Sequence, residues 1–327
     1  MSTLPTWTIA IPTYNGEAFL EKTLQSVMTQ TSQAFELIVC DDCSTDESVS
    51  IVKRLCGHRV VLHLNESGTN LGLAGNWNRC VELASGEWIT ILHQDDLLLP
   101  GFIEKHRSVA GVSGEIGMIT GPADLVDADG NTISALENRD DMKWPDTDYI
   151  IWQWHEMADV LVKCNPLRCP ATSFRRDLHQ KIGGFDVKWK YVVDWDFWYR
   201  LSQVANVAML NEKLAFQRWH EASETQRLAQ GTIDLEENEA IMYRILDDNF
   251  YRKDDRVVNE RAILRRLALA WLARATQAAA AGNRRLELKL LRKAFQCDSS
   301  MTMKALADSP KTLAMLMLGI SWRRRFH

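Results

Sequence analysis

The chain has 327 residues, of which 46% are hydrophobic, and this is enough apolar material for one large domain or two modest ones. Its 38 basic and 43 acidic residues give a formal net charge of −5, which provides no overall positive field for the phosphates of a nucleic acid. We therefore expect no nucleic-acid partner.

Apolar runs alternate with amphipathic patterns along the first third of the chain. Strands are expected at 7–13, 35–40, 60–64 and 87–92, and helices at 17–30, 46–55, 73–84 and 101–110. Alternation at this spacing is typical of β-α-β units. The sequence therefore predicts an α/β fold with a doubly wound, mostly parallel sheet.

Two pairs of aspartates follow predicted strands. Asp41 and Asp42 end one strand, and Asp95 and Asp96 follow another in the stretch ILHQDDLLLP. Open α/β sheets bind their ligands at the carboxyl ends of the strands, so both pairs are expected at one edge. A helix cap needs only one such side chain, and two adjacent pairs would repel each other without a cation or a donor-rich ligand between them. The pairs favour a binding site over simple caps.

Several ordered motifs extend this pattern. The stretch TIAIPTYNGEAFLEKTLQSVMTQTSQAFELIVCDDCSTDES resembles the opening of glycosyltransferase family two, and NLGLAGNWNRCVELASGEWITILHQDDLLLP is similar to the segment that follows in that family. FRRDLHQKIGGFD and DWDFWYRL resemble its acceptor-side segments, so the resemblance covers residues 7–225. It implies an inverting enzyme with a GT-A fold, in which a Rossmann-like nucleotide-binding half precedes an acceptor half.

The resemblance also implies roles for residues on the nucleotide side. Pro12 and Tyr14 would line the nucleotide cleft, and Asp42 would accept a hydrogen bond from the base, which suits uridine. Asp95 would contact the ribose. Asp96 would bind a divalent metal ion, manganese or magnesium, that bridges the diphosphate and stabilises the departing nucleotide.

Many family members carry another aspartate two residues before Asp95, where this chain has His93, followed by Gln94. A single direct carboxylate ligand to the metal is therefore expected. The stretch FQRWHEASETQ resembles a family motif whose histidine lies by the diphosphate or the metal. His220 is accordingly either a metal ligand or a structural histidine, and Arg218 would share its face.

Inverting transfer needs a base to take the proton of the acceptor hydroxyl. YVVDWDFWYRL offers Asp194 and Asp196, which point in different directions at a helix start, so only one can face the cleft. The family pattern selects Asp194, although Val193 stands where an acidic residue is common. The other aspartate is expected to cap or support the helix.

The acceptor side and the C-terminal region have less specific patterns. Trp144, Trp152 and Trp154 could stack on sugar rings or belong to the core. The stretch 261–298 predicts two antiparallel amphipathic helices joined at Gly282-Asn283. The tail, apolar over 313–320 and followed by Trp322 and three arginines, could lie on an anionic membrane surface or pack on the protein.

These patterns predict a glycosyltransferase domain at 1–228, with its nucleotide-binding half at 1–100 and its acceptor half at 101–228, and a helical extension at 229–327. The expected activity is that of a hexosyl- or hexosaminyltransferase that moves a sugar from a UDP-sugar to a glycan or lipid-linked acceptor in polysaccharide synthesis. The alternatives are a non-catalytic sugar-nucleotide-binding module and a nucleotidyltransferase. With no signal peptide or run of about 18 apolar residues, a cytoplasmic protein is expected, with peripheral membrane contact through the tail as one option.

Overall fold

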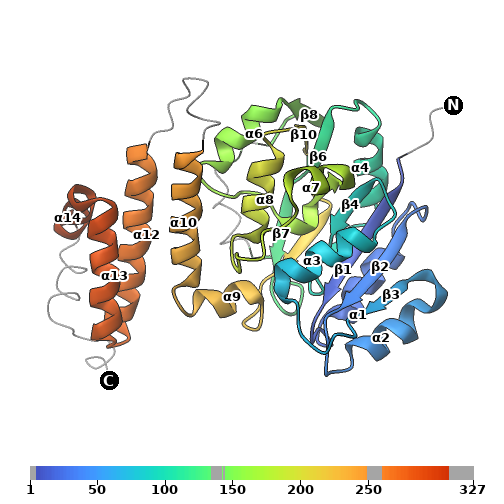
Figure 1. The fold of residues 1–327 in the computed structure, drawn as a ribbon, viewed down its shortest axis with the longest axis horizontal. Helices are drawn as coiled ribbons and strands as arrows, with labels where there is room; N and C mark the ends of the chain where they lie inside the picture. Colours follow the sequence, from blue (N-terminus) through green and yellow to red (C-terminus); the bar gives the residue numbers. More distant parts are fainter. Residues whose placement is uncertain (1–4, 134–141, 143, 249–259, 309–327) are drawn as a thin grey trace. The chain divides into compact units, whose positions relative to one another are not determined.

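The computed structural model describes residues 5–133, 142, 144–248 and 260–308, whose arrangement Figure 1 shows. The chain divides into two compact units, Met1–Arg227 and Leu228–His327. The first unit is built on β-sheets with helices on their faces, and the described part of the second is helical.

The elements of the first half of this unit, in chain order, are β1 (Trp7–Thr13), α1 (Leu20–Met28), β2 (Glu36–Asp41), α2 (Ser48–Cys56), η1 (Gly57–Arg59), β3 (Val61–Leu64), α3 (Gly72–Leu83), β4 (Trp88–Ile91), β5 (Leu97–Leu98) and α4 (Phe102–Ala110). The elements that follow are β6 (Ile116–Thr120), β7 (Ala123–Val126), β8 (Tyr149–Trp152), α6 (Trp154–Leu161), η2 (Cys169–Ala171), β9 (Thr172–Arg175), α7 (Arg176–Ile182), α8 (Val193–Leu201), β10 (Asn206–Leu210), β11 (Ala215–Arg218) and α9 (Glu224–Ala229).

The strands form a large sheet of eight strands in the order β3-β2-β1-β4-β9-β6-β10-β8, and a small sheet in the order β5-β11-β7. The first four strands of the large sheet are parallel, and β6 and β10 are parallel to each other. Strand β9 is antiparallel to both of its neighbours, and β8 is antiparallel to β10. The predicted α/β fold with a mostly parallel sheet is confirmed.

Strand β1 lies at the centre of the parallel half and is buried along its whole length, as expected for a strand with helices on both faces. It pairs with β2 up to Thr13, whereas its pairing with β4 ends at Ala10. Pro12, which has no N–H to donate, therefore stands beyond the last rung with β4. The strand can carry a proline there without losing a ladder hydrogen bond on that side.

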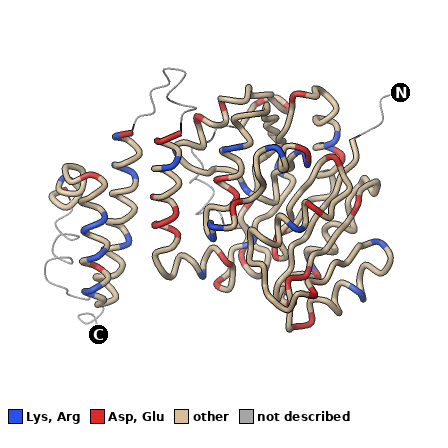
Figure 2. The backbone as a smooth tube through the Cα atoms, in the orientation of Figure 1, with Lys and Arg blue, Asp and Glu red and all other residues tan. Residues whose placement is uncertain are grey.

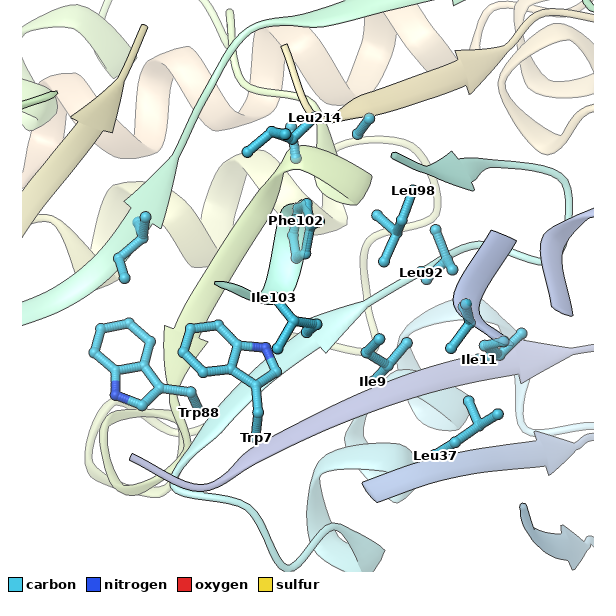
Figure 3. Packing of buried hydrophobic residues seen from close by; sticks show 14 of the residues in the cluster. Trp7, Ile9, Ile11, Leu37, Trp88, Leu92, Leu98, Phe102, Ile103 and Leu214 are labelled. Atoms are coloured by element: carbon cyan, nitrogen blue, oxygen red, sulfur yellow. The ribbon is translucent and has the colours of Figure 1, made fainter. Parts of the chain in front are cut away.

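The core beside this strand contains apolar side chains from β1, β4, α4 and the loops (Figure 3). The rings of Trp7 and Trp88 stack with centroids 5.4 Å apart. A buried polar chain crosses the core: Trp7 Nε1 donates to Thr90 Oγ1 over 3.0 Å, the Thr90 and Ser173 hydroxyls lie 2.7 Å apart, and His106 Nδ1 lies 2.9 Å from Ser173 Oγ. These contacts join β1, β4, β9 and α4 in the core.

The second unit contains α10 (Ile233–Asp247), α12 (Glu260–Ala280), α13 (Arg284–Cys297) and α14 (Ser299–Asp308). Helices α12 and α13 form the predicted pair, and Gly282 between them has a φ of +75°, a left-handed conformation that suits glycine. Asn283 caps α13, its Oδ1 accepting a hydrogen bond from Leu286 N over 3.1 Å. The predicted helical hairpin is confirmed.

In the part of the chain that the structure describes, no helix combines the length and the apolar character that crossing a membrane requires. The C-terminal tail, for which the sequence left membrane contact or packing open, lies outside the described residues.

Candidate active site

The two aspartate pairs lie at the same edge of the large sheet. β2, β1 and β4 are neighbouring parallel strands in this order. The chain segments that leave β2 and β4 therefore emerge at the same edge of the sheet, on either side of the segment that leaves β1. Figure 2 shows acidic residues on the loops at this edge. The sequence-based expectation that Asp41-Asp42 and Asp95-Asp96 share one edge is confirmed.

The segment after β4 brings three potential metal ligands together. One ligand atom from each of His93, Asp95 and Asp96 lies within 4.8 Å of the other two. Nδ1 of His93 is 3.1 Å from Oδ2 of Asp96, whose side chain is 1% exposed. This carboxylate oxygen has no hydrogen bond of good geometry to any described residue. A buried carboxylate oxygen in that state is suited to a cation.

Strand β11 closes the other side of this group. Arg218, its last residue, donates its backbone N–H to Oδ1 of Asp96 over 2.8 Å. Its guanidinium donates to the carbonyls of Asp95, Asp127 and Ala128. His220 follows, with Nε2 2.9 Å from Oδ2 of Asp95. His220 therefore reaches the acidic pair through Asp95.

The other aspartate pair is bound more tightly within the protein. Asp42 is 1% exposed, and its carboxylate accepts hydrogen bonds from Asn65 Nδ2 over 2.7 Å and from Leu71 N over 2.9 Å. Asp41 is 4% exposed and accepts a hydrogen bond from Ser44 N on Oδ2. Asp41 thus fixes the loop after β2, and Asp42 fixes the loop after β3.

The loop after β1 places Tyr14 at the surface, where it is 48% exposed. Its backbone is held by one side chain: Tyr14 N donates to Oε1 of Gln94, and Nε2 of Gln94 donates back to Tyr14 O. A Cβ at position 16 would lie 2.3 Å from Oε1 of Gln94, so a larger residue than Gly16 would displace this amide. Gln94 thus connects the Pro12–Tyr14 segment to the acidic pair.

The two aspartates at the start of α8 have different surroundings. Asp194 is half-buried, and its carboxylate accepts hydrogen bonds from Asn165 Nδ2 over 3.1 Å and Trp195 N over 2.7 Å. Asp196 is fully buried and forms an ion pair of 2.7 Å with Arg200. As expected from the spacing, the two side chains have separate environments, and Asp196 supports the helix.

Electrostatic interactions connect Asp194 with the group after β4. Burial raises the pKa of Asp194, and the opposing effects of Trp195 N–H, His93 and Asn165 do not cancel it. Burial and the neighbouring Asp95 likewise raise the pKa of Asp96, against its contact with His93. Carboxyl groups with raised pKa values in one site are typical of proton-transfer and ligand-binding centres.

His93 lies between these carboxyl groups. Burial alone would lower its pKa, but Cys169 and Asp96 outweigh burial and hold the pKa of His93 well above its ordinary value. The ring stacks on Trp77, with centroids 5.1 Å apart.

Comparisons with known proteins agree with this geometry. Residues 8–122 match the protein-family model described as glycosyl transferase family 2. A PGL/p-HBAD biosynthesis glycosyltransferase of Mycobacterium bovis is 31% identical over 196 residues, which are 59% of this chain and 68% of the relative. The chain belongs to glycosyltransferase family 2. An uncharacterized protein of Mycobacterium tuberculosis is 30% identical over 303 residues, covering 88% of this chain and 89% of that protein.

Solved structures support the fold of this glycosyltransferase. The structure of Staphylococcus aureus TarS 1-349 in complex with UDP-GlcNAc aligns with a TM-score of 0.56 and 15% identity, over 95% of this chain and 81% of that one. A second TarS 1-349 structure, in complex with UDP, aligns with a TM-score of 0.56 and 16% identity, over 93% and 92%. The predicted GT-A fold with a helical C-terminal region is confirmed.

Some residues of the site carried no signal in the sequence. Asn165, in the stretch CNPLRCP, holds Asp194, and Cys169 lies beside His93. Neither occurs in a recognisable motif, and both reach the site only through long-range packing. Trp152 is half-buried and Trp154 is 37% exposed, so neither is a fully buried core residue.

Proposed function

We propose that this family 2 glycosyltransferase moves a hexosyl or hexosaminyl group from a UDP-sugar to a glycan or lipid-linked glycan acceptor, with inversion. One observation carries the proposal. Asp194, an aspartate with a raised pKa, interacts electrostatically with His93, which in turn contacts Asp96. A candidate base and a candidate diphosphate-binding carboxylate therefore belong to one site.

On the donor side, Pro12, Tyr14, Asp42 and Asp95 are proposed to bind the nucleotide. The exposed ring of Tyr14 is available for stacking, and Asp95 is bonded to His220, which would hold its carboxylate toward a ribose. Asp42 already accepts hydrogen bonds from Leu71 and Asn65, so its contact with the base would share those oxygens. The TarS structures in complex with UDP-GlcNAc and UDP support a uridine donor.

The residues after β4 fit a divalent metal ion. Asp96 offers a buried oxygen without a good hydrogen bond from any described residue, and hard oxygen ligands suit manganese or magnesium. We propose Asp96 and His220 as the metal-binding residues, and Nε2 of His220 lies 2.9 Å from Oδ2 of Asp95. When bound, the ion would neutralise charge on the departing diphosphate.

Asp194 is proposed to act as the base. It would accept the proton of the acceptor hydroxyl as that oxygen attacks the anomeric carbon from the face opposite the nucleotide, which inverts the configuration. Asn165 and the N–H of Trp195 hold the carboxylate in place. A raised pKa makes Asp194 a stronger base than an ordinary aspartate once it has lost its proton.

The acceptor is proposed to be bound by the half of the domain formed by residues 101–228. The relatedness to a PGL/p-HBAD biosynthesis glycosyltransferase supports an acceptor of glycan or glycolipid type. An acceptor attached to lipid would bring the reaction to the cytoplasmic face of a membrane. The arginine-rich C-terminal tail is proposed to provide peripheral contact there.

Thermal-shift measurements test the donor and the metal together. UDP or a UDP-sugar with manganese should raise the melting temperature, because a ligand at 100 times its Kd stabilises the folded state by about 2.7 kcal/mol. Asp96→Ala should lose the metal-dependent part of the shift. A shift seen only with GDP or dTDP ligands would contradict the uridine assignment, and unchanged manganese dependence in Asp96→Ala would show that the metal is held elsewhere.

A further inference from the structure

Position 93, two residues before Asp95, is a histidine in this chain. Its Nδ1 faces Asp96 Oδ2 at 3.1 Å, and both residues belong with Asp95 to the compact group of ligand atoms within 4.8 Å of one another. An octahedral ion with bonds of about 2.1 Å places adjacent ligand atoms roughly 3 Å apart. The observed separation therefore matches one edge of such an octahedron.

The side chains of His93 and Asp96 do not satisfy each other with a well-formed hydrogen bond, which favours a ligand between them. Asp96 is 1% exposed, and its Oδ2 makes no hydrogen bond of good geometry with the described residues, although Nδ1 of His93 is close. Burying a carboxylate oxygen without a well-formed partner is costly. An ion between Nδ1 and Oδ2 would satisfy both atoms without moving either side chain far.

The ring of His93 is also held in the orientation that a ligand requires. It stacks on Trp77 with an interplanar angle of 26°, its Nε2 is buried without a hydrogen-bond partner among the described residues, and Cys169 lies near the ring. Histidines that bind metals are oriented by contacts of the nitrogen that does not touch the ion. Here the stacked ring of Trp77 supplies this orientation.

We propose that His93 binds the metal ion directly through Nδ1, and that this imidazole makes the site prefer manganese and other transition-metal ions over magnesium. The inference rests on the proposed metal-assisted transfer and goes beyond it. Carboxylate and water ligands suit both magnesium and manganese, but a nitrogen ligand shifts a site toward transition-metal ions, and manganese accepts imidazole more readily than magnesium does. A carboxylate at position 93 would contribute an oxygen ligand, whereas the histidine contributes a nitrogen.

The test uses the full-length protein with saturating UDP and counts nitrogen ligands by pulsed electron paramagnetic resonance of bound Mn²⁺. Wild type should show ¹⁴N coupling from a directly bound imidazole, and this coupling should persist in His220→Asn. In His93→Asn the coupling from this ring should disappear and Mn²⁺ affinity should fall about tenfold or more. His58→Asn, which removes an exposed histidine, is the matched control and should behave as wild type.

Titration calorimetry with Mn²⁺ and Mg²⁺ measures the preference. His93→Asp should reduce the ratio of Mn²⁺ to Mg²⁺ affinity relative to wild type, by about tenfold. If His93 only donates a hydrogen bond to Asp96, wild type and His93→Asn will give the same ¹⁴N coupling and His93→Asp will keep the affinity ratio. That result overturns the inference and leaves the proposed transferase intact. If wild type binds neither ion with UDP, both the inference and the metal in the proposed function are wrong.

Discussion

Asp194 and Asp196, in the first turn of α8, have different interaction partners and therefore different expected roles. Asp196 is buried against Arg200, which also donates to the carbonyls of Ile182 and Gly184, so this pair fastens α8 to the end of α7. Among the described residues, Asp194 accepts hydrogen bonds from Asn165 and Trp195. The difference allows a pair of matched variants to separate structure from chemistry.

Asp194→Asn should reduce the transfer rate by about 10²–10⁴-fold, because an amide keeps the shape but cannot take the proton. Donor binding should survive, since this residue would face the acceptor. Asp196→Asn should lower the melting temperature, because it weakens a buried ion pair, while the folded protein keeps most of its turnover. Equal losses of kcat at both positions, with normal stability, would reject Asp194 as the base.

The pH dependence of kcat gives an independent measurement on Asp194. Burial raises its pKa above the usual 3.8, so the carboxylate is protonated, and unable to act as a base, at pH values where an ordinary aspartate is ionised. The rate should therefore fall as the pH drops through this raised pKa. An acidic limb at or below pH 3.8 would contradict the assignment.

The buried side chain of His106 should make the free energy of unfolding depend on pH. Burial lowers the pKa of His106 from 6.5 to about 3, whereas the unfolded chain keeps a value near 6.5. The unfolded state therefore binds a proton between these two values and the folded state does not. The free energy of unfolding should decrease by up to about 1.4 kcal/mol per pH unit as the pH falls from about 6.5 toward 3.

Urea unfolding at pH 7.5 and 5 measures this effect. His106→Gln should remove about one proton of the difference, whereas His58→Gln, at an exposed position, should leave the pH dependence unchanged. An equal pH dependence in wild type and His106→Gln would show that this ring is not the source.

At the scale of secondary structure, the first hundred residues were the most predictable. β1 occupies the expected residues 7–13, and β2, β3 and β4 lie within one residue of expectation at their starts. Local patterns suffice there because each parallel strand is an apolar run bounded by a helix with its own periodicity. The aspartate pairs could be placed for the same reason, since each directly follows one of these runs.

The later part of the sheet could not be read in this way. β9 is a four-residue strand, TSFR, whose place between β4 and β6 depends on pairing with residues far away in the chain. The contacts of His93 with Asp96 and Cys169 likewise depend on tertiary packing. The sequence showed that position 93 departs from the family pattern, but not which atoms the ring would face.

The start of α13 allows a prediction for a single element. Asn283→Ala removes the oxygen that accepts the N–H of Leu286, which should cost about 1 kcal/mol. The loss should appear as a lower melting temperature of the second unit, followed by circular dichroism. Asn283→Asp, which keeps an accepting oxygen, should retain most of the stability, and equal losses in both variants would argue against a capping role.

At the scale of the whole molecule, the C-terminal tail is the part to be tested first. Figure 2 marks Lys and Arg positions along the backbone of α12 and α13, and the sequence of the tail adds three more arginines after Trp322. The full chain should bind anionic vesicles weakly, since each arginine near the surface contributes about 1 kcal/mol, and salt should weaken this binding. Deletion of 310–327 should abolish it.

The deletion variant also distinguishes the two options for the tail. If removal of 310–327 leaves a monodisperse protein that no longer sediments with vesicles, the tail is a membrane contact. If it instead produces aggregates, the tail packs on the protein, and the membrane contact is wrong.

Strand β9 has a consequence for how the first unit can be divided. It pairs with β4 on one side and β6 on the other, so one unbroken ladder runs from β3, β2, β1 and β4 to β6, β10 and β8. A fragment ending near residue 100 would leave the backbone groups of β4 exposed along an open edge, which favours association with other chains. The strands before and after residue 100 therefore belong to one sheet, and a fragment cut there is not expected to fold on its own.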